Sequence, residues 1–92
     1  MPTDPPNDAP KDGYLLALNA LAATLADQRL ADRFLSLSGI SPPDLKQRAG
    51  DPLFLADFLR FLESHEPDLV DIATKISVKP DDLVIARQFL EA

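Results

Sequence analysis

The chain has 92 residues, 46% of them hydrophobic, and its 15 Asp and Glu outnumber its 9 Lys and Arg, for a net charge of -6. This length favours one domain with one core, and the lack of cysteine excludes a disulfide framework, a thiolate metal site and a thiol nucleophile. The acidic balance also disfavours a large phosphate-binding surface, because such a surface needs clustered positive charge.

The first twelve residues differ in composition from the rest of the chain. Residues 1–12 contain four prolines and no large apolar side chain except Met1. Such a segment cannot bury enough surface to offset the entropy lost on ordering, so we expect a disordered tail before a single helical domain over residues 13–92. The segment lacks the features of a signal peptide, and no later apolar run is long enough to span a membrane. These features favour a cytoplasmic protein.

Prolines mark where most helices are expected to begin. The pairs Ser41-Pro42, Asp51-Pro52, Glu66-Pro67 and Lys79-Pro80 each place proline in a first helical turn, where its fixed φ and missing N–H are tolerated. With Asp27 as a cap, Gly39 as a left-handed stop and apolar residues at three- and four-residue steps, the pattern predicts helices over about 13–25, 28–38, 42–49, 53–64, 67–77 and 80–90. Short connections favour a compact all-α bundle of five or six short helices.

Each predicted helix has residues that we expect to face the core. The fourth is apolar over most of its circumference and holds three of the five phenylalanines, so we place it at the centre. In the other helices the expected core residues are Leu15, Leu18, Leu21, Ala22 and Leu25; Leu30, Phe34 and Leu37, followed by Ile40; Leu45 and Ala49; Leu69, Ile72, Ala73 and Ile76; and Leu83, Ala86, Phe89 and Leu90.

Many of the acidic residues fall at helix starts. The partial positive charge of a helix N-terminus stabilises anions, and carboxylates there accept hydrogen bonds from free backbone N–H groups. We therefore interpret seven acidic residues as helix-capping or first-turn residues: Asp27, Asp44, Asp51, Glu66, Asp68, Asp81 and Asp82.

Positions 38 residues apart resemble one another. Pro42 matches Pro80, and Ile40 corresponds to Val78. Two related three-helix halves would explain these matches, and so would helix starts of a common type in any bundle. Lys46, Gln47 and Arg48 align with Val84, Ile85 and Ala86, so the sixth helix is either more buried than the third or carries an apolar contact surface.

Four segments, 17–22, 33–40, 44–55 and 80–87, resemble in order a family of short uncharacterised all-helical proteins from alphaproteobacteria. The likeness covers about residues 14–92, and its most specific part is Arg-Ala-Gly-Asp-Pro-Leu-Phe-Leu at 48–55. Members commonly carry a glycine before the last proline-containing turn, where this chain has Ser77-Val78. The resemblance implies a bacterial cytoplasmic origin and no catalytic residue, because the family has no assigned activity.

The residue types that carry chemistry are sparse. His65 is the only histidine, and acidic residues lie on both sides of it. A transition-metal site usually needs two or more nitrogen or sulfur ligands, so a solvated histidine at a helix cap explains the same residues. The three glycines are too far apart for a phosphate-binding loop, and nothing supplies a positioned nucleophile. We expect no metal, no cofactor, no catalytic residue and no enzymatic activity.

A protein-binding module is the function that the sequence favours. Surplus apolar residues outside the helix stripes can mark a partner site for an unidentified protein or for a second copy of the chain. Such residues are Leu16, Leu55, Val70, Val84 and Ile85. We expect Val84, Ile85 and Val70 to form the partner face.

The alternative is a DNA-binding regulator with a helix-turn-helix over about residues 28–49. A glycine-containing turn joins the two helices, and Lys46, Gln47 and Arg48 would be exposed on the second. Against this, the second helix has only about two turns, Arg48 falls where the motif usually buries an apolar residue, and the chain is acidic. The sequence therefore favours a protein partner over nucleic acid, and membrane binding is not expected.

Overall fold

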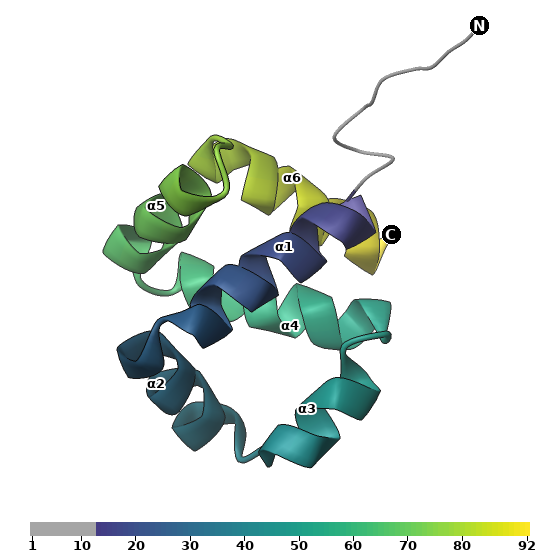
Figure 1. The fold of residues 1–92 in the computed structure, drawn as a ribbon. Coiled ribbons are helices and arrows are strands. Elements are labelled where there is room, and N and C mark those ends of the chain that lie inside the picture. The colour runs from purple at the N-terminus through teal and green to yellow at the C-terminus, as the bar shows by residue number, and fades with distance from the viewer. Residues whose placement is uncertain (1–12) are drawn as a thin grey trace, which may run out of the picture.

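The computed structural model describes residues 13–92 and places six α-helices there. They are α1 (Gly13–Ala26), α2 (Gln28–Ser38), α3 (Pro42–Arg48), α4 (Pro52–Glu63), α5 (Glu66–Lys75) and α6 (Pro80–Glu91). The compact all-α bundle predicted from the sequence is confirmed. Helices α1 and α4 cross at its centre, with α5 and α6 on one side and α2 and α3 on the other (Figure 1). The expected tail, residues 1–12, lies outside the described residues.

Helix α4 forms the middle of the core, as predicted. Phe58, Leu59 and Leu62 are fully buried, and α4 packs against α1, α5 and α6. Burying a large apolar side chain contributes roughly 1.5–3 kcal/mol, so this helix supplies a large share of the hydrophobic stabilisation. One apolar residue of α4, Leu53 in its first turn, is exposed instead.

Helix α1 buries only part of the face that was predicted: Leu21 is buried and Leu18 packs against the core as expected, but Ala22 is exposed. Leu15 and Leu25 are exposed, whereas Ala17 and Ala20 are fully buried. Leucine and alanine surround the whole helix, so their spacing alone does not select one stripe. Small side chains on the buried face allow α1 to lie close to α4 and α6, which explains why two alanines point inward beside Leu21.

Two more predicted core residues, Phe89 and Leu37, are exposed. The ring of Phe89 lies against the start of α1, where a Cβ added to Gly13 would come within 2.7 Å of Phe89 Cδ2. Leu37 lies near the end of α2, and no neighbouring helix covers it. The start of α1 covers Phe89 only in part and no helix covers Leu37, so both predictions were wrong.

Acidic side chains cap the helices as predicted. Asp27 Oδ1 accepts hydrogen bonds from the N–H groups of Arg29 and Leu30 at 3.1 and 3.3 Å, and Asp51 Oδ1 accepts one from Leu53 at 3.0 Å. The remaining five lie in the first turns of α3, α5 and α6: Asp44, Glu66, Asp68, Asp81 and Asp82.

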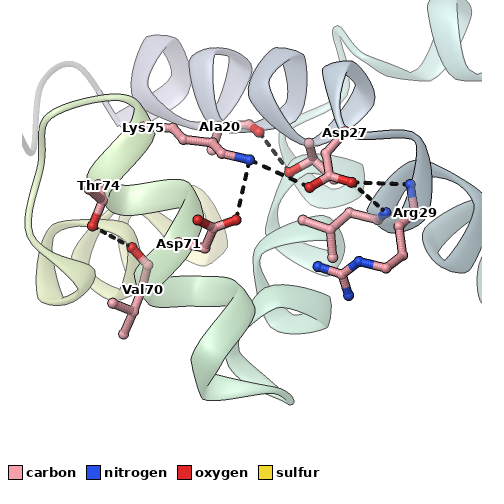
Figure 2. Close-up of polar contacts among 9 residues, drawn as sticks. Ala20, Asp27, Arg29, Val70, Asp71, Thr74 and Lys75 are labelled. Atoms are coloured by element: carbon pink, nitrogen blue, oxygen red, sulfur yellow. Dashed lines mark hydrogen bonds and ion pairs between the residues drawn. The ribbon is translucent and has the colours of Figure 1, made fainter.

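Asp27 also joins the α1–α2 corner to α5 (Figure 2). Its Oδ2 lies 3.4 Å from Lys75 Nζ, which lies 3.2 Å from Asp71 Oδ2. The backbone N–H of Leu30, helped by Lys75, holds the pKa of Asp27 below its ordinary value of 3.8. Asp71, with Asp27, raises the pKa of Lys75 above 10.5. Both shifts favour the charged forms that this contact requires.

A second set of ion pairs joins α6 to α4. Arg87 contacts Glu63 of α4 and Glu91 of its own helix, and Arg60 of α4 also contacts Glu91. The guanidinium of Arg60, followed by that of Arg87, lowers the pKa of Glu91 below 4.5. The two arginines and two carboxylates therefore fix how α6 lies along α4.

Helices α2 and α5 are both followed by a residue with left-handed backbone. Gly39 has φ 71° and closes the last turn of α2. Ser77 has φ 62°, its N–H donates to the carbonyl of Thr74, and the N–H of Val78 donates to the carbonyl of Ala73. These two bonds form a Schellman motif, whose left-handed position usually holds glycine. The turn before the last proline therefore has the geometry that glycine favours, with serine in its place.

The two halves of the chain follow one plan, 38 residues apart. Helices α2 and α5 begin at 28 and 66, α3 and α6 begin at 42 and 80, and the left-handed residues are 39 and 77. Apart from Gly13, each buried residue of α1–α3 has a buried counterpart 38 positions later: Ala17 and Leu55, Ala20 and Phe58, Leu21 and Leu59, Thr24 and Leu62, Leu30 and Asp68, Phe34 and Ile72, Leu45 and Leu83. Helix starts of a common type would not by themselves also align the buried residues of the two halves. Two related three-helix halves are therefore favoured.

The halves differ most in their third helix. Helix α6 has 12 residues and packs on α4 and α1 with Leu83, Ala86 and Leu90 buried. Helix α3 has 7 residues, buries only Leu45, and carries exposed Arg48 where α6 carries Ala86. It lies at the outer edge of the molecule (Figure 1). The first half is therefore less completely filled than the second.

Candidate functional site

A hollow of about 480 Å³ lies between α2, α3 and α4. Binding sites for small molecules are commonly concave and of this size. The hollow is lined by Phe34, Leu37, Ser38, Gly39, Ile40, Asp44, Arg48, Phe54, Asp57 and Phe61. It forms because α3 ends after 7 residues and turns only one buried apolar side chain inward, which leaves the space between α2 and α4 partly open.

Phenylalanine rings form the floor of the hollow. The ring centroid of Phe34 on α2 lies 6.1 Å from Phe54, 5.4 Å from Phe58 and 5.1 Å from Phe61, all on α4. Phe34 meets Phe58 edge to face at 80°, a favoured geometry for aromatic pairs. Phe34 and Phe54 are themselves buried and Phe61 is half-buried, so the floor is the packed edge of the core and is already formed in the free protein.

Arg33, on α2, contacts both this floor and α5. Its guanidinium carbon lies 5.7 Å from the ring centroid of Phe61, within the range of a cation–π contact, and the same guanidinium pairs with Asp68. Asp68 is buried, and its Oδ2 also lies 3.0 Å from Nδ1 of His65. These contacts tie α2, α4 and α5 together behind the rings.

His65 differs in part from its predicted role. It occupies the N-cap position of α5, which begins at Glu66, one residue earlier than predicted. Its side chain makes no capping hydrogen bond and contacts Asp68 instead, while about half of it remains exposed. Within residues 13–92 no group of three or more His, Asp and Glu side chains is placed to hold a metal ion.

Leu37 and Ile40 form the apolar rim of the hollow. Leu37 is 72% exposed, and Ile40 is half-buried. Between them, a Cβ added to Gly39 would meet no atom within 4 Å, so nothing fills the space beside the turn. Leu37 and Ile40 therefore leave apolar surface uncovered at the mouth of the hollow.

Charged side chains form the rest of the rim. Asp44 and Arg48 lie on α3, and Asp57 lies on α4. In the part of the chain that the structure describes, none of these three takes part in an ion pair. The mouth of the hollow therefore carries two carboxylates and one guanidinium, a net negative charge.

The partner face predicted from the sequence lies elsewhere. Val70 on α5 and Ile85 on α6 are each 42% exposed, and Val84 is half-buried. The side chain of Val70 points away from the Lys75–Asp27 contact (Figure 2). None of the three lines the hollow, and their role as a partner face stays a prediction.

Two other residues considered surplus on the helix surfaces are not freely exposed. Leu55 is fully buried in α4, so its assignment as a surface residue was wrong. Leu16 is half-buried and packs against the core. The apolar side chains with the greatest exposure are instead Leu37, Leu53 and Leu15.

The residues predicted to contact DNA lie on α3 as expected, and all are exposed. The turn 39–41 joins α2 to α3, so the order of a helix-turn-helix is present. Consecutive residues lie about 100° apart around a helix, so Lys46, Gln47 and Arg48 spread over about 200° and do not share one face. Arg48 lines the hollow, which directs it away from a groove contact.

The hollow itself was missed in the sequence because its apolar lining residues were assigned to the core. Phe34, Phe54 and Leu37 all have the spacing of core residues. Phe34 and Phe54 are buried, and only the structure shows that Leu37 is left uncovered. One signal was available. A third helix with Leu45 as its one large inward-facing residue cannot cover the faces of two longer helices.

Comparison with known proteins gives a family. The model of a family described as "Protein of unknown function (DUF3572)" matches residues 10–92. No curated protein and no solved structure matches the chain. Within the described residues, no helix combines the length and apolar character needed to cross a membrane.

Proposed function

The chain belongs to the DUF3572 family, whose function is unknown, and we propose that it is a non-catalytic protein-binding module. One observation carries this function: a hollow with an aromatic floor and an exposed leucine at its rim, between α2, α3 and α4. The non-catalytic character, and a place in a bacterial cytoplasm, rest on the sequence alone.

The geometry of the hollow supports binding of another chain. An apolar side chain that becomes fully buried on binding contributes roughly 1.5–3 kcal/mol, and 480 Å³ holds more than one. The rings of Phe34, Phe54 and Phe61 already pack together in the free protein. A preformed floor reduces the ordering cost of association, so a modest contact area can give useful affinity.

Affinity purification with matched variants tests the proposed function. Leu37→Asp places a charge at the rim, and Leu53→Asp makes the same change at a leucine that does not line the hollow. The two side chains are 72% and 63% exposed, so neither substitution opens a cavity in the core. A partner retained by the wild-type chain and Leu53→Asp, and lost from Leu37→Asp, supports the function. A partner retained equally by all three contradicts it.

The same experiment compares the hollow with the partner face predicted from the sequence. Ile85→Asp changes that face at an exposed position. Loss of the partner from Ile85→Asp and its retention by Leu37→Asp would overturn the assignment to the hollow. Light scattering identifies the case of a second copy, because a dimer that Leu37→Asp separates into monomers places the hollow in the dimer interface.

A further inference from the structure

We infer that the hollow receives an amphipathic α-helix of a partner protein, with basic side chains beside its apolar stripe. This inference rests on the proposed function and adds the shape and chemistry of the partner. It is carried by the correspondence between the two halves of the chain and by the charges at the mouth of the hollow.

The second half of the chain indicates which kind of structural element packs at the position that corresponds to the hollow. Thirty-eight positions after the exposed Arg48 lies Ala86, which is buried, whereas Phe34 and its counterpart Ile72 are buried in both halves. The helix that closes the second half is α6, with 12 residues packed on α1, α4 and α5. Its counterpart α3 ends after 7 residues, and the faces of α2 and α4 beside it stay open. An added helix would complete the first half as α6 completes the second.

The apolar pattern of α6 also indicates what the added helix should present. Leu83, Ala86 and Leu90 are its buried residues, at steps of three and four along the helix. A stripe of this kind laid into an apolar groove is a common mode of peptide recognition. We expect the partner helix to carry a leucine-alanine-leucine stripe, or one of similar volume, toward Leu37, Ile40 and Phe61, the apolar lining residues that stay accessible.

The charges at the mouth indicate the flanks of the partner helix. Asp44 and Asp57 line the hollow and have no ion-pair partner within residues 13–92. Asp82, the counterpart of Asp44, is occupied: its Oδ2 accepts a hydrogen bond from the N–H of Lys79 at 3.0 Å. With a net charge of -6 for the whole chain, the field at the mouth favours lysine and arginine on the incoming helix and speeds its encounter.

Two synthetic peptides of about twelve residues test the inference by fluorescence anisotropy. Both carry leucine, alanine and leucine with the spacing of α6. One has lysines at the positions beside the stripe, and the other has glutamates there. We expect the lysine peptide to bind about tenfold more tightly at low salt, a ratio that two exposed charge pairs can supply. The double variant Asp44→Asn/Asp57→Asn should remove this preference. Asp32→Asn/Asp81→Asn, which changes net charge equally outside the hollow, should keep it.

The outcomes separate this inference from the proposed function. Equal binding of both peptides to the wild-type chain, lost in Leu37→Asp, would overturn the basic character of the partner and leave the binding site in place. If neither peptide binds while Leu37→Asp still loses the native partner, the helical shape is overturned and the proposed function stands. A lysine preference that survives Asp44→Asn/Asp57→Asn would overturn the role of these two carboxylates.

Discussion

Replacing Ser77 with glycine should stabilise the protein. Within residues 13–92, Ser77 is the only residue other than glycine with positive φ, at 62°. An L-residue costs about 1–2 kcal/mol in this conformation, and the added backbone entropy of glycine costs about 0.5–1 kcal/mol. The difference is a gain of about 0.5–1 kcal/mol in the free energy of unfolding for Ser77→Gly. Ser77 is exposed, so no core packing is lost with its side chain.

Gly39 provides the matched control, because it holds the corresponding place at the end of α2 with φ 71°. A Cβ added there would meet no atom within 4 Å, so Gly39→Ala changes only the backbone preference. By the same two terms, we expect Gly39→Ala to lower the free energy of unfolding by about 0.5–1 kcal/mol. Ser77→Ala keeps the left-handed cost and should stay within about 0.5 kcal/mol of the wild-type chain.

Urea unfolding followed by circular dichroism measures these differences, with equal slopes indicating the same change in exposed surface. In a chain of this size, 1 kcal/mol corresponds to a change of about 4–8 °C in Tm. If Ser77→Gly instead loses about 1 kcal/mol, as glycine does in an ordinary helix, the left-handed end of α5 is refuted.

Three further predictions concern the polar contacts and α3. Because the pKa of Asp27 is lowered in the fold, its contribution to stability is present above the ordinary value of 3.8 and is lost as pH falls through the folded-state pKa. Asp27→Asn should therefore flatten the acid side of a urea-unfolding profile against pH, and an unchanged profile would contradict the lowered pKa of Asp27, which the N–H of Leu30 causes first and Lys75 second. Arg87→Met should lower the free energy of unfolding by about 1 kcal/mol, and Glu63→Gln should cost less in that background than alone, whereas additive costs would show that the two residues are not coupled. An amide-shift titration with duplex DNA at moderate salt should leave residues 42–50 unmoved, and movement there would instead support the helix-turn-helix alternative.

The starts and ends of the helices could be predicted because local chemistry sets them. Proline at a first helical position, Asp27 and Asp51 as N-caps, and Gly39 as a left-handed end act within a few residues of the chain. The buried face of α1 could not be predicted in this way. Leucine and alanine surround that helix, and the choice of face depends on how closely α4 and α6 approach it.

The candidate site was hidden for a similar reason. Leu37 has the spacing of a core residue on α2, and its exposure follows from the length of α3 and its place at the edge of the molecule. The left-handed backbone of Ser77 was also not visible in the residue type, because serine rarely adopts it. Both features depend on the arrangement of neighbouring helices rather than on local sequence.

The most direct test of the hollow as the partner site is an amide-shift titration of the full chain with the lysine peptide. The shifts should concentrate around the hollow, at Gly39, Ile40, Phe54 and Phe61. Shifts that instead appear at Val70, Val84 and Ile85, with the residues of the hollow unmoved, would contradict the assignment and support the face predicted from the sequence.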